Sequence, residues 1–187
     1  MYRRTLDATL LSVALVVAAA GCGGASTPRL VTNRHVAGGR LSAELSTWDG
    51  TDLGATISHV SSVSDLASMT GPAGDGLALA LSDPRPATPV WVAGYPGGGA
   101  LQLIRGTVLD YTDGRGYGEA GRLVRSDVPL MHGSSGSPVM NSSGEVVGVA
   151  FGVESDNSEA LIVPASTVRR FLSASQPSTA QRNCSSG

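Results

Sequence analysis

A serine in a glycine-rich loop is the strongest chemical signal in this sequence. Ser135 lies within Gly133–Pro138, where glycines flank a pair of serines, and the strand-like run Pro138–Met140 follows. Because glycine adopts backbone angles that other residues avoid, such a loop can present a hydroxyl at the surface and aim N–H groups at a developing oxyanion. The pattern predicts that Ser135 is a nucleophile and that the N–H groups of Gly133 and Ser135 form an oxyanion hole.

A histidine and an aspartate stand where they could activate this serine. His35 lies at the end of the β-type run Leu30–Val36, which would hold its ring rigidly enough for a general base. Asp65 lies in the apolar stretch Val63–Ala67, and a buried aspartate bonded to an imidazole fixes its tautomer and stabilises the imidazolium. Alone, the histidine would more often be a core residue, and the aspartate a turn or cap residue. Their order with Ser135 is that of the chymotrypsin arrangement, whereas α/β-hydrolases begin with serine.

Four other candidates carry weaker signals. Asp75 also precedes an apolar run and is the reserve candidate for the third member of the triad. His132 stands beside the serine loop without an obvious partner, which favours a residue at the rim of the site. His59 falls in an alternating run and is interpreted as structural. The Gly97–Gly99 run lacks the spacing of a phosphate-binding loop, so a turn is expected.

Composition excludes several function classes. The chain has 187 residues, of which 41% are hydrophobic and 15% charged, which fits one globular domain or two small barrels. A net charge of −2 gives no electrostatic footprint for nucleic acid. All 13 basic residues are arginine, so chemistry that needs lysine is excluded. Three scattered histidines and two cysteines argue against a structural zinc site, and the proposed chemistry needs no metal or cofactor.

The elements that must position these residues are mostly strands. Many short β-rich runs separated by turn clusters predict an all-β barrel or sandwich. One helix is expected, capped by Ser166 and with Val168, Phe171 and Leu172 on one face, and a polar tail (174–187) follows it. The β-rich runs are Leu41–Thr47, Leu53–Val60, Pro89–Tyr95, Leu101–Leu109, Arg122–Val128, Glu145–Phe151 and Ala160–Val163.

The N-terminal segment predicts export. Residues 1–21 combine Arg3 and Arg4 with the apolar run Leu10–Ala20, which is shorter than the roughly 20 residues of a membrane span. The segment Ala19–Cys22 resembles a lipobox, so Cys22 is a candidate for acylation and membrane anchoring. A Cys22–Cys184 disulfide would exclude acylation, and the sequence leaves both open. The expected location is extracellular or at the cell envelope. The other interpretation of the run is a buried strand.

Taken together, the motifs resemble the trypsin-like serine peptidases, especially the compact bacterial HtrA and mycobacterial acid-resistance types. The resemblance runs from about residue 29 to 168. It implies two perpendicular six-stranded β-barrels with a cleft between them and a C-terminal helix, within a peptidase domain over 22–173. It also implies a protein or peptide substrate, with Ala150, Phe151 and Gly152 lining the cleft. The matching motifs are Thr32–Val36, Ser64–Ala67, Trp91–Gly98, Gly133–Pro138 and Val146–Gly152.

Three departures from the family pattern affect the interpretation. Ser134 stands where trypsin has the aspartate that receives the new N-terminus, so that activation switch cannot operate. Pro129 stands where trypsin has the carboxylate at the base of its pocket, which points away from cleavage after arginine or lysine and suggests a small or apolar preference. Only 12 residues separate Cys22 from His35, where the family has two strands.

The short segment before the histidine leaves alternatives open. The first barrel is abbreviated, or the apolar run supplies a strand, or the chain begins downstream of its true start. Two other functions are therefore kept beside an exported serine endopeptidase. One is a catalytically silent peptidase-like binding module, and the other is an esterase that uses the same triad. The oligomeric state is left open.

Overall fold

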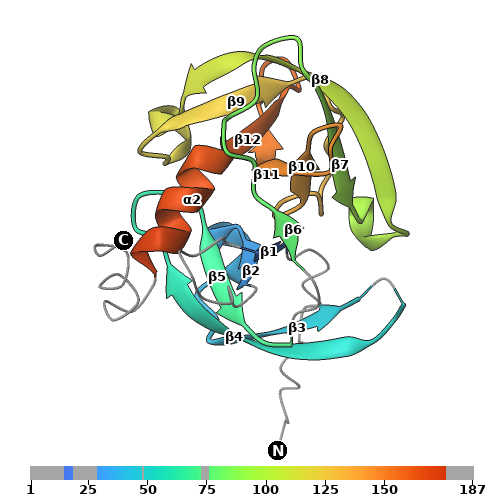
Figure 1. Cartoon of the computed structure of the whole chain (residues 1–187), viewed down its shortest axis with the longest axis vertical. Helices are drawn as coiled ribbons and strands as arrows, with labels where there is room; N and C mark the ends of the chain where they lie inside the picture. Colours follow the sequence, from blue (N-terminus) through green and yellow to red (C-terminus); the bar gives the residue numbers. More distant parts are fainter. Residues whose placement is uncertain (1–14, 19–28, 48, 73–75, 176–187) are drawn as a thin grey trace, which may run out of the picture.

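Two six-stranded β-sheets make up most of the protein. The structure is a computed structural model that describes residues 15–18, 29–47, 49–72 and 76–175. Within these residues, twelve strands divide equally between a first sheet and a closed barrel, which lie one above the other (Figure 1). The prediction of an all-β fold with two six-stranded halves and a C-terminal helix is confirmed, although the described strands of the first half do not close into a hydrogen-bonded ring.

The first sheet has the strand order β3-β4-β5-β2-β1-β6. Alternation explains its inner face: in β3, Ala43 and Leu45 are buried while Ser42 and Glu44 are exposed, because side chains on a strand alternate between its two sides. Leu30, Ala55 and Met69 join them in one apolar cluster. The strands are β1 (Leu15–Ala18), β2 (Arg29–Thr32), β3 (Ser42–Ser46), β4 (Asp52–Val60), β5 (Ala67–Thr70) and β6 (Leu77–Ala78).

Strand β1 comes from the apolar run near the N-terminus. It pairs antiparallel with β2, with Leu15 opposite Val31, and parallel with β6. Of the three alternatives for the short segment before the histidine, the structure therefore has the one in which the apolar run supplies a strand. Removal of residues 1–21 as a signal peptide concerns the same residues and stays a prediction. Cys22, Cys184 and Asp75 lie outside the described residues.

The second half is a closed barrel with the order β10-β11-β12-β9-β8-β7. Its core strands β11 and β12 are almost continuously apolar and come close together at Gly148. A Cβ at this glycine would lie 2.5 Å from Ile162 Cγ2 and 2.6 Å from the Val163 carbonyl, so a larger residue would push the strands apart. The strands are β7 (Pro89–Gly94), β8 (Gln102–Asp113), β9 (Arg122–Ser126), β10 (Pro138–Met140), β11 (Val146–Val153) and β12 (Ala160–Pro164), with 3₁₀ turns η1 (Pro96–Gly98) and η2 (Gly114–Tyr117).

The C-terminal helix α2 (Ala165–Ala174) packs against β11 and β12. The predicted apolar face is confirmed, because Val168, Phe171 and Leu172 are buried. The predicted cap is wrong: Ser166 is the second residue of the helix and its side chain caps nothing. The Asp83 carboxylate caps the start of the helix instead, because it accepts hydrogen bonds from the Ser166 N–H at 2.8 Å and from the Ser166 hydroxyl at 2.7 Å.

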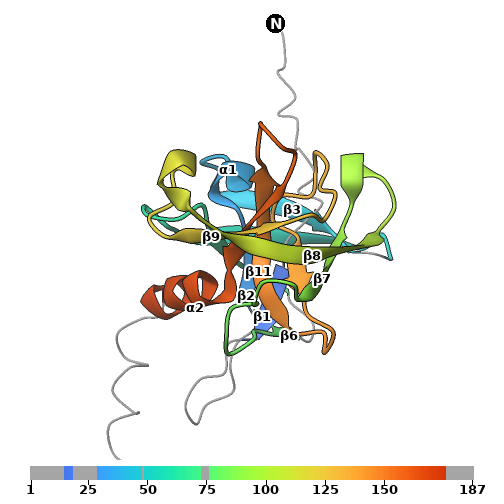
Figure 2. The same cartoon turned by 90° about the horizontal axis from the view of Figure 1, so that it is seen from above.

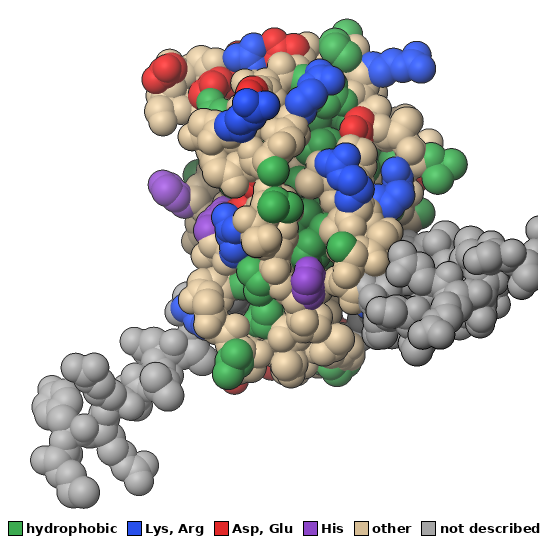
Figure 3. All heavy atoms as spheres, turned by 90° about the vertical axis from the view of Figure 1, so that its left-hand side faces the viewer, with side chains coloured by type: hydrophobic (Ala, Val, Ile, Leu, Met, Phe, Trp, Pro, Cys, Tyr) green, Lys and Arg blue, Asp and Glu red, His purple; other side chains and the backbone are tan. Residues whose placement is uncertain are grey.

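The exposed arginines gather on the closed barrel. Figure 3 shows most of them on the upper half of one side of the molecule. Two arginines of this barrel have defined partners: the half-buried Arg125 contacts Asp110 at 2.5 Å, and the exposed Arg122 guanidinium lies 4.2 Å from the centre of the Tyr111 ring. Such planar stacking and forked pairing suit arginine better than lysine. Among the described residues, no helix is long and apolar enough to cross a membrane.

Candidate active site

His35 lies in a short helical turn that follows β2. This turn, α1 (Arg34–Ala37), ends at Gly38, which has a φ of 59°. The predicted strand through residue 36 is wrong beyond Thr32, because the Arg34 N–H leaves the sheet and donates to the Asp65 carbonyl at 3.1 Å. Figure 2 shows α1 and α2 on opposite sides of the molecule.

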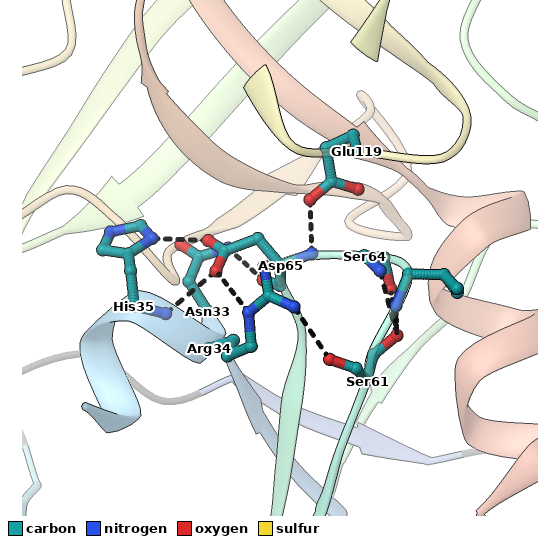
Figure 4. A network of polar contacts seen from close by, with 8 residues as sticks. Asn33, Arg34, His35, Ser61, Ser64, Asp65 and Glu119 are labelled. Carbon is teal, nitrogen blue, oxygen red and sulfur yellow. Dashed lines mark hydrogen bonds and ion pairs between the residues drawn. The ribbon is translucent and has the colours of Figure 1, made fainter. Parts of the chain in front are cut away.

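Asp65 is brought against His35 by two hydrogen bonds (Figure 4). One carboxylate oxygen accepts the backbone N–H of His35 at 2.9 Å, and the other is bonded to Nδ1 of its ring. The aspartate side chain is 6% exposed and the histidine side chain 48% exposed. A carboxylate at Nδ1 holds the proton there, so Nε2 is left as the acceptor. This is the tautomer that a general base for a hydroxyl requires.

The serine loop has two unpaired backbone donors. Ser134 donates its N–H to the carbonyl three residues earlier at 2.9 Å, and Gly136 donates to a β11 carbonyl at 2.9 Å. The N–H of Gly133, just before Ser134, and the N–H of Ser135, between Ser134 and Gly136, have no hydrogen-bond partner among the described residues. Gly133 has a φ of 92° and Gly136 of 88°, angles that favour glycine. Two free donors flanking one residue suit an oxyanion.

Phe151 joins the two parts of the site. The Ser135 hydroxyl donates to the Phe151 carbonyl at 3.2 Å, and the His35 ring meets the Phe151 ring edge-on with centroids 6.0 Å apart. Among the described residues no hydrogen bond links the serine to the histidine. Of the three residues of β11 predicted to line the cleft, Ala150 is buried, and Phe151 and Gly152 are half-buried. The structure therefore places both side chains around one residue of β11.

The remaining candidates lie outside this arrangement. His59 on β4 packs against Phe171 of α2, with ring centroids 5.3 Å apart, as a structural role predicts. His132 is exposed, and its carbonyl accepts the Gly97 N–H at 2.8 Å. In the described part of the chain, no three His, Cys, Asp or Glu side chains group as metal ligands.

Sequence reasoning missed Glu119. Its side chain is 3% exposed, and its carboxylate accepts the backbone N–H of Asp65 (Figure 4). Burial raises the pKa of the Glu119 carboxyl, and the charge of Asp65 adds to the rise, whereas the bond from the Asp65 N–H and the Arg34 guanidinium lower it. The residue sits in a glycine-rich turn that gives no chemical signal of its own.

Comparisons with known proteins agree with this fold. Residues 14–149 match the family model described as a trypsin-like peptidase domain. The Rv3671c protease of M. tuberculosis, in its active form, is 25% identical, with a TM-score of 0.68 over 78% of this chain and 68% of that one. No curated protein matches the sequence.

Two further solved structures share the fold at lower identity. A serine endoprotease of Yersinia pestis is 17% identical, with a TM-score of 0.73 over 93% of this chain and 60% of its own. The HtrA-type protease AlgW, solved with a decapeptide, is 18% identical, with a TM-score of 0.72 over 92% of this chain and 52% of its own. Because the family model matches well over half of its length, the chain belongs to the trypsin-like peptidase family and is a serine endopeptidase.

Proposed function

We propose that this serine endopeptidase cuts peptide bonds through Ser135, His35 and Asp65. The observation that carries the proposal is the pair of bonds between Asp65 and His35, which leaves Nε2 of the imidazole as a proton acceptor. The two unpaired N–H groups of the serine loop support it, since an oxyanion needs donors that no other group occupies. The binding-module alternative is not favoured by the family match.

The proposed reaction runs through an acyl-enzyme. The Ser135 hydroxyl leaves the Phe151 carbonyl, gives its proton to Nε2 of His35, and its oxygen bonds to the scissile carbonyl carbon. The N–H groups of Gly133 and Ser135 hold the resulting oxyanion. The imidazolium returns the proton to the leaving amine as the C–N bond breaks. A water molecule then repeats the sequence against the acyl ester and releases the acid. Contacts in free enzymes are often longer than in complexes, which fits a serine that turns when substrate binds.

The substrate is proposed to be a protein or peptide with a small or apolar residue at the cleavage position. Pro129 gives the pocket no carboxylate, and AlgW, of similar fold, is solved with a decapeptide. A panel of peptides that differ only at that position tests the preference. Faster cleavage after arginine than after alanine would contradict it.

The proposed location is outside the cytoplasm, on the strength of Arg3, Arg4 and the apolar run that follows them. Part of this run forms β1, so a leader that is removed and a strand that is kept exclude each other. The intact mass and N-terminal sequence of the purified protein distinguish the two. A start at Cys22, with or without an acyl group, supports export by a cleaved leader, and a start at Met1 contradicts it.

Replacement of Ser135 tests the chemistry. We expect Ser135→Ala to lose casein hydrolysis by on the order of 10⁶-fold and to lose labelling by a fluorophosphonate probe, while thermal unfolding is unchanged. Ser143→Ala, in the exposed turn before β11, is the matched control and keeps both activities. Hydrolysis by Ser135→Ala at the parent rate would overturn the proposal. Turnover of an ester faster than its matched amide, with no casein cleavage, would favour an esterase.

A further inference from the structure

Glu119 lies in a tight loop of the closed barrel, between η2 and β9. Gly114 donates its N–H to the Gly121 carbonyl at 2.9 Å, and Glu119 donates its N–H to the Gly114 carbonyl at 2.9 Å. A Cβ at Gly114 would come within 2.5 Å of the Glu119 Cβ and 2.3 Å of the Gly121 carbonyl oxygen. The loop therefore needs glycine at this position, and its two hydrogen bonds fix where the glutamate begins.

The glutamate reaches from the closed barrel to the segment that carries Asp65. Its carboxylate accepts the Asp65 N–H, and the next residue, Ala120, donates its N–H to the Val63 carbonyl at 2.8 Å. The carbonyl of Asp65 is bonded within its own half, to the Arg34 N–H at 3.1 Å and the Asn33 side chain at 3.0 Å. Of the two backbone polar groups of Asp65, the N–H is thus the one that the other half of the molecule holds.

The contact itself is buried, with Asp65 4% exposed and Glu119 3% exposed. A cavity of about 430 Å³ lies between the two loops and α2, and its lining includes Ser61, Ser64, Ala120 and Gly121. Beside this cavity, two hydrogen bonds join the loops, one from the Asp65 N–H to Glu119 and one from the Ala120 N–H to the Val63 carbonyl.

We infer that Glu119 is a positioning residue, which fixes Asp65, and through it the His35 ring, from the opposite half of the molecule. The inference rests on the proposed roles of His35 and Ser135. Without an acceptor at this point, the buried Asp65 N–H loses its partner and the segment shifts to find another. A displacement of about 1 Å in a catalytic group costs on the order of 100-fold in rate.

Three variants test the inference. Glu119→Ala removes the acceptor, so we expect kcat to fall about 100-fold with KM unchanged, and fluorophosphonate labelling to slow in parallel. Glu119→Gln keeps an oxygen for the Asp65 N–H and is expected to restore kcat to within about threefold of the parent. Glu44→Ala, an exposed glutamate on β3, is the control and leaves kcat unchanged.

A spectroscopic measurement separates positioning from loss of stability. The proton on Nδ1 of His35, bonded to Asp65, should give a far-downfield ¹H NMR signal in the parent and in Glu119→Gln, and no such signal in Glu119→Ala. If the alanine variant does not fold, Glu119→Asp replaces it, because a side chain one methylene shorter cannot reach the Asp65 N–H, and its kcat should fall below that of Glu119→Gln.

The outcomes separate this inference from the proposed function. Hydrolysis by Ser135→Ala at the parent rate would show that the triad itself is wrong. If Ser135→Ala is inactive but Glu119→Ala, or its aspartate substitute, keeps the parent kcat and the downfield signal, the triad stands and the role of Glu119 is overturned. A glutamine variant as slow as the alanine variant would also overturn it, because the acceptor would then be irrelevant.

Discussion

Replacement of Asp65 by asparagine should change the histidine tautomer while leaving the fold intact. In the parent, two carboxylate oxygens meet two donors, the backbone N–H of His35 at 2.9 Å and Nδ1 of its ring. An asparagine offers only one oxygen and one NH₂ group. The backbone N–H cannot become an acceptor, whereas the ring can switch tautomer. The amide oxygen therefore stays on the backbone N–H, the NH₂ group faces Nδ1, and the ring proton moves to Nε2.

The expected loss follows from that switch. A ring protonated at Nε2 cannot accept the serine proton, which costs on the order of 10⁴-fold in kcat, or about 5 kcal/mol in activation free energy. KM should be unchanged. The substitution also removes the ion pair between Arg34 Nε and Asp65, which are 3.7 Å apart. Because the Arg34 side chain is partly exposed, this loss should lower the free energy of unfolding by no more than about 1 kcal/mol.

Steady-state kinetics on a peptide substrate, together with thermal unfolding, measure both effects. Asp52→Asn is the matched control, since Asp52 is an exposed aspartate on β4 that accepts a hydrogen bond from Ser46, and it should behave as the parent. A folded Asp65→Asn variant with kcat within tenfold of the parent would refute the reasoning, because the tautomer would then not depend on Asp65.

Three further predictions concern stability. Gly148→Ala should lower the unfolding free energy by about 1–3 kcal/mol, measured by chemical denaturation, because the added Cβ meets β12. Gly54→Ala is the control and should not lower it, because the space around Gly54 is open. Equal effects of the two substitutions would contradict the packing argument. Asp83→Ala should cost about 1 kcal/mol by removing the acceptor for Ser166 at the start of α2, and amide exchange should quicken in the first turn of that helix. Because burial raises the pKa of Glu119, its contribution to stability is present below about pH 4.5 and is lost as the pH rises through the higher folded-state pKa. As the pH rises through this range, the unfolding free energy of Glu119→Gln should therefore increase relative to that of the parent. A difference between the two unfolding free energies that does not change with pH would contradict the raised pKa.

The three proposed triad residues were predicted from local signals together with their order along the chain, because the local context of His35 or Asp65 alone favours a structural role. Glycines around Ser135 and a short apolar stretch around Asp65 are features of neighbouring residues, so they can be read from the sequence directly. The Asp65–His35 contact then follows from the fold of the first sheet. The end of β2 could not be predicted, because the Arg34 N–H is drawn away by a carbonyl 31 residues further along the chain.

Glu119 shows a second limit of sequence reasoning. It contacts Asp65 across 54 residues and from the other half of the molecule. Neither hydrophobic periodicity nor a spacing rule connects two residues that lie in loops of different halves of the molecule. Strand β5 was missed for a related reason: four residues between a loop and a turn are too few to show alternation, and its pairing with β2 and β4 makes it a strand.

Strand β1 also determines which backbone edges of the first sheet are exposed. It is hydrogen-bonded on both sides, with three residue pairs to β2 and two to β6. A chain that lacked it would present the N–H and C=O groups of β2 to solvent as an open template. Such an edge accepts an extended peptide or the same strand of another copy. Shortened forms of this protein should therefore tend to associate or aggregate through the first sheet.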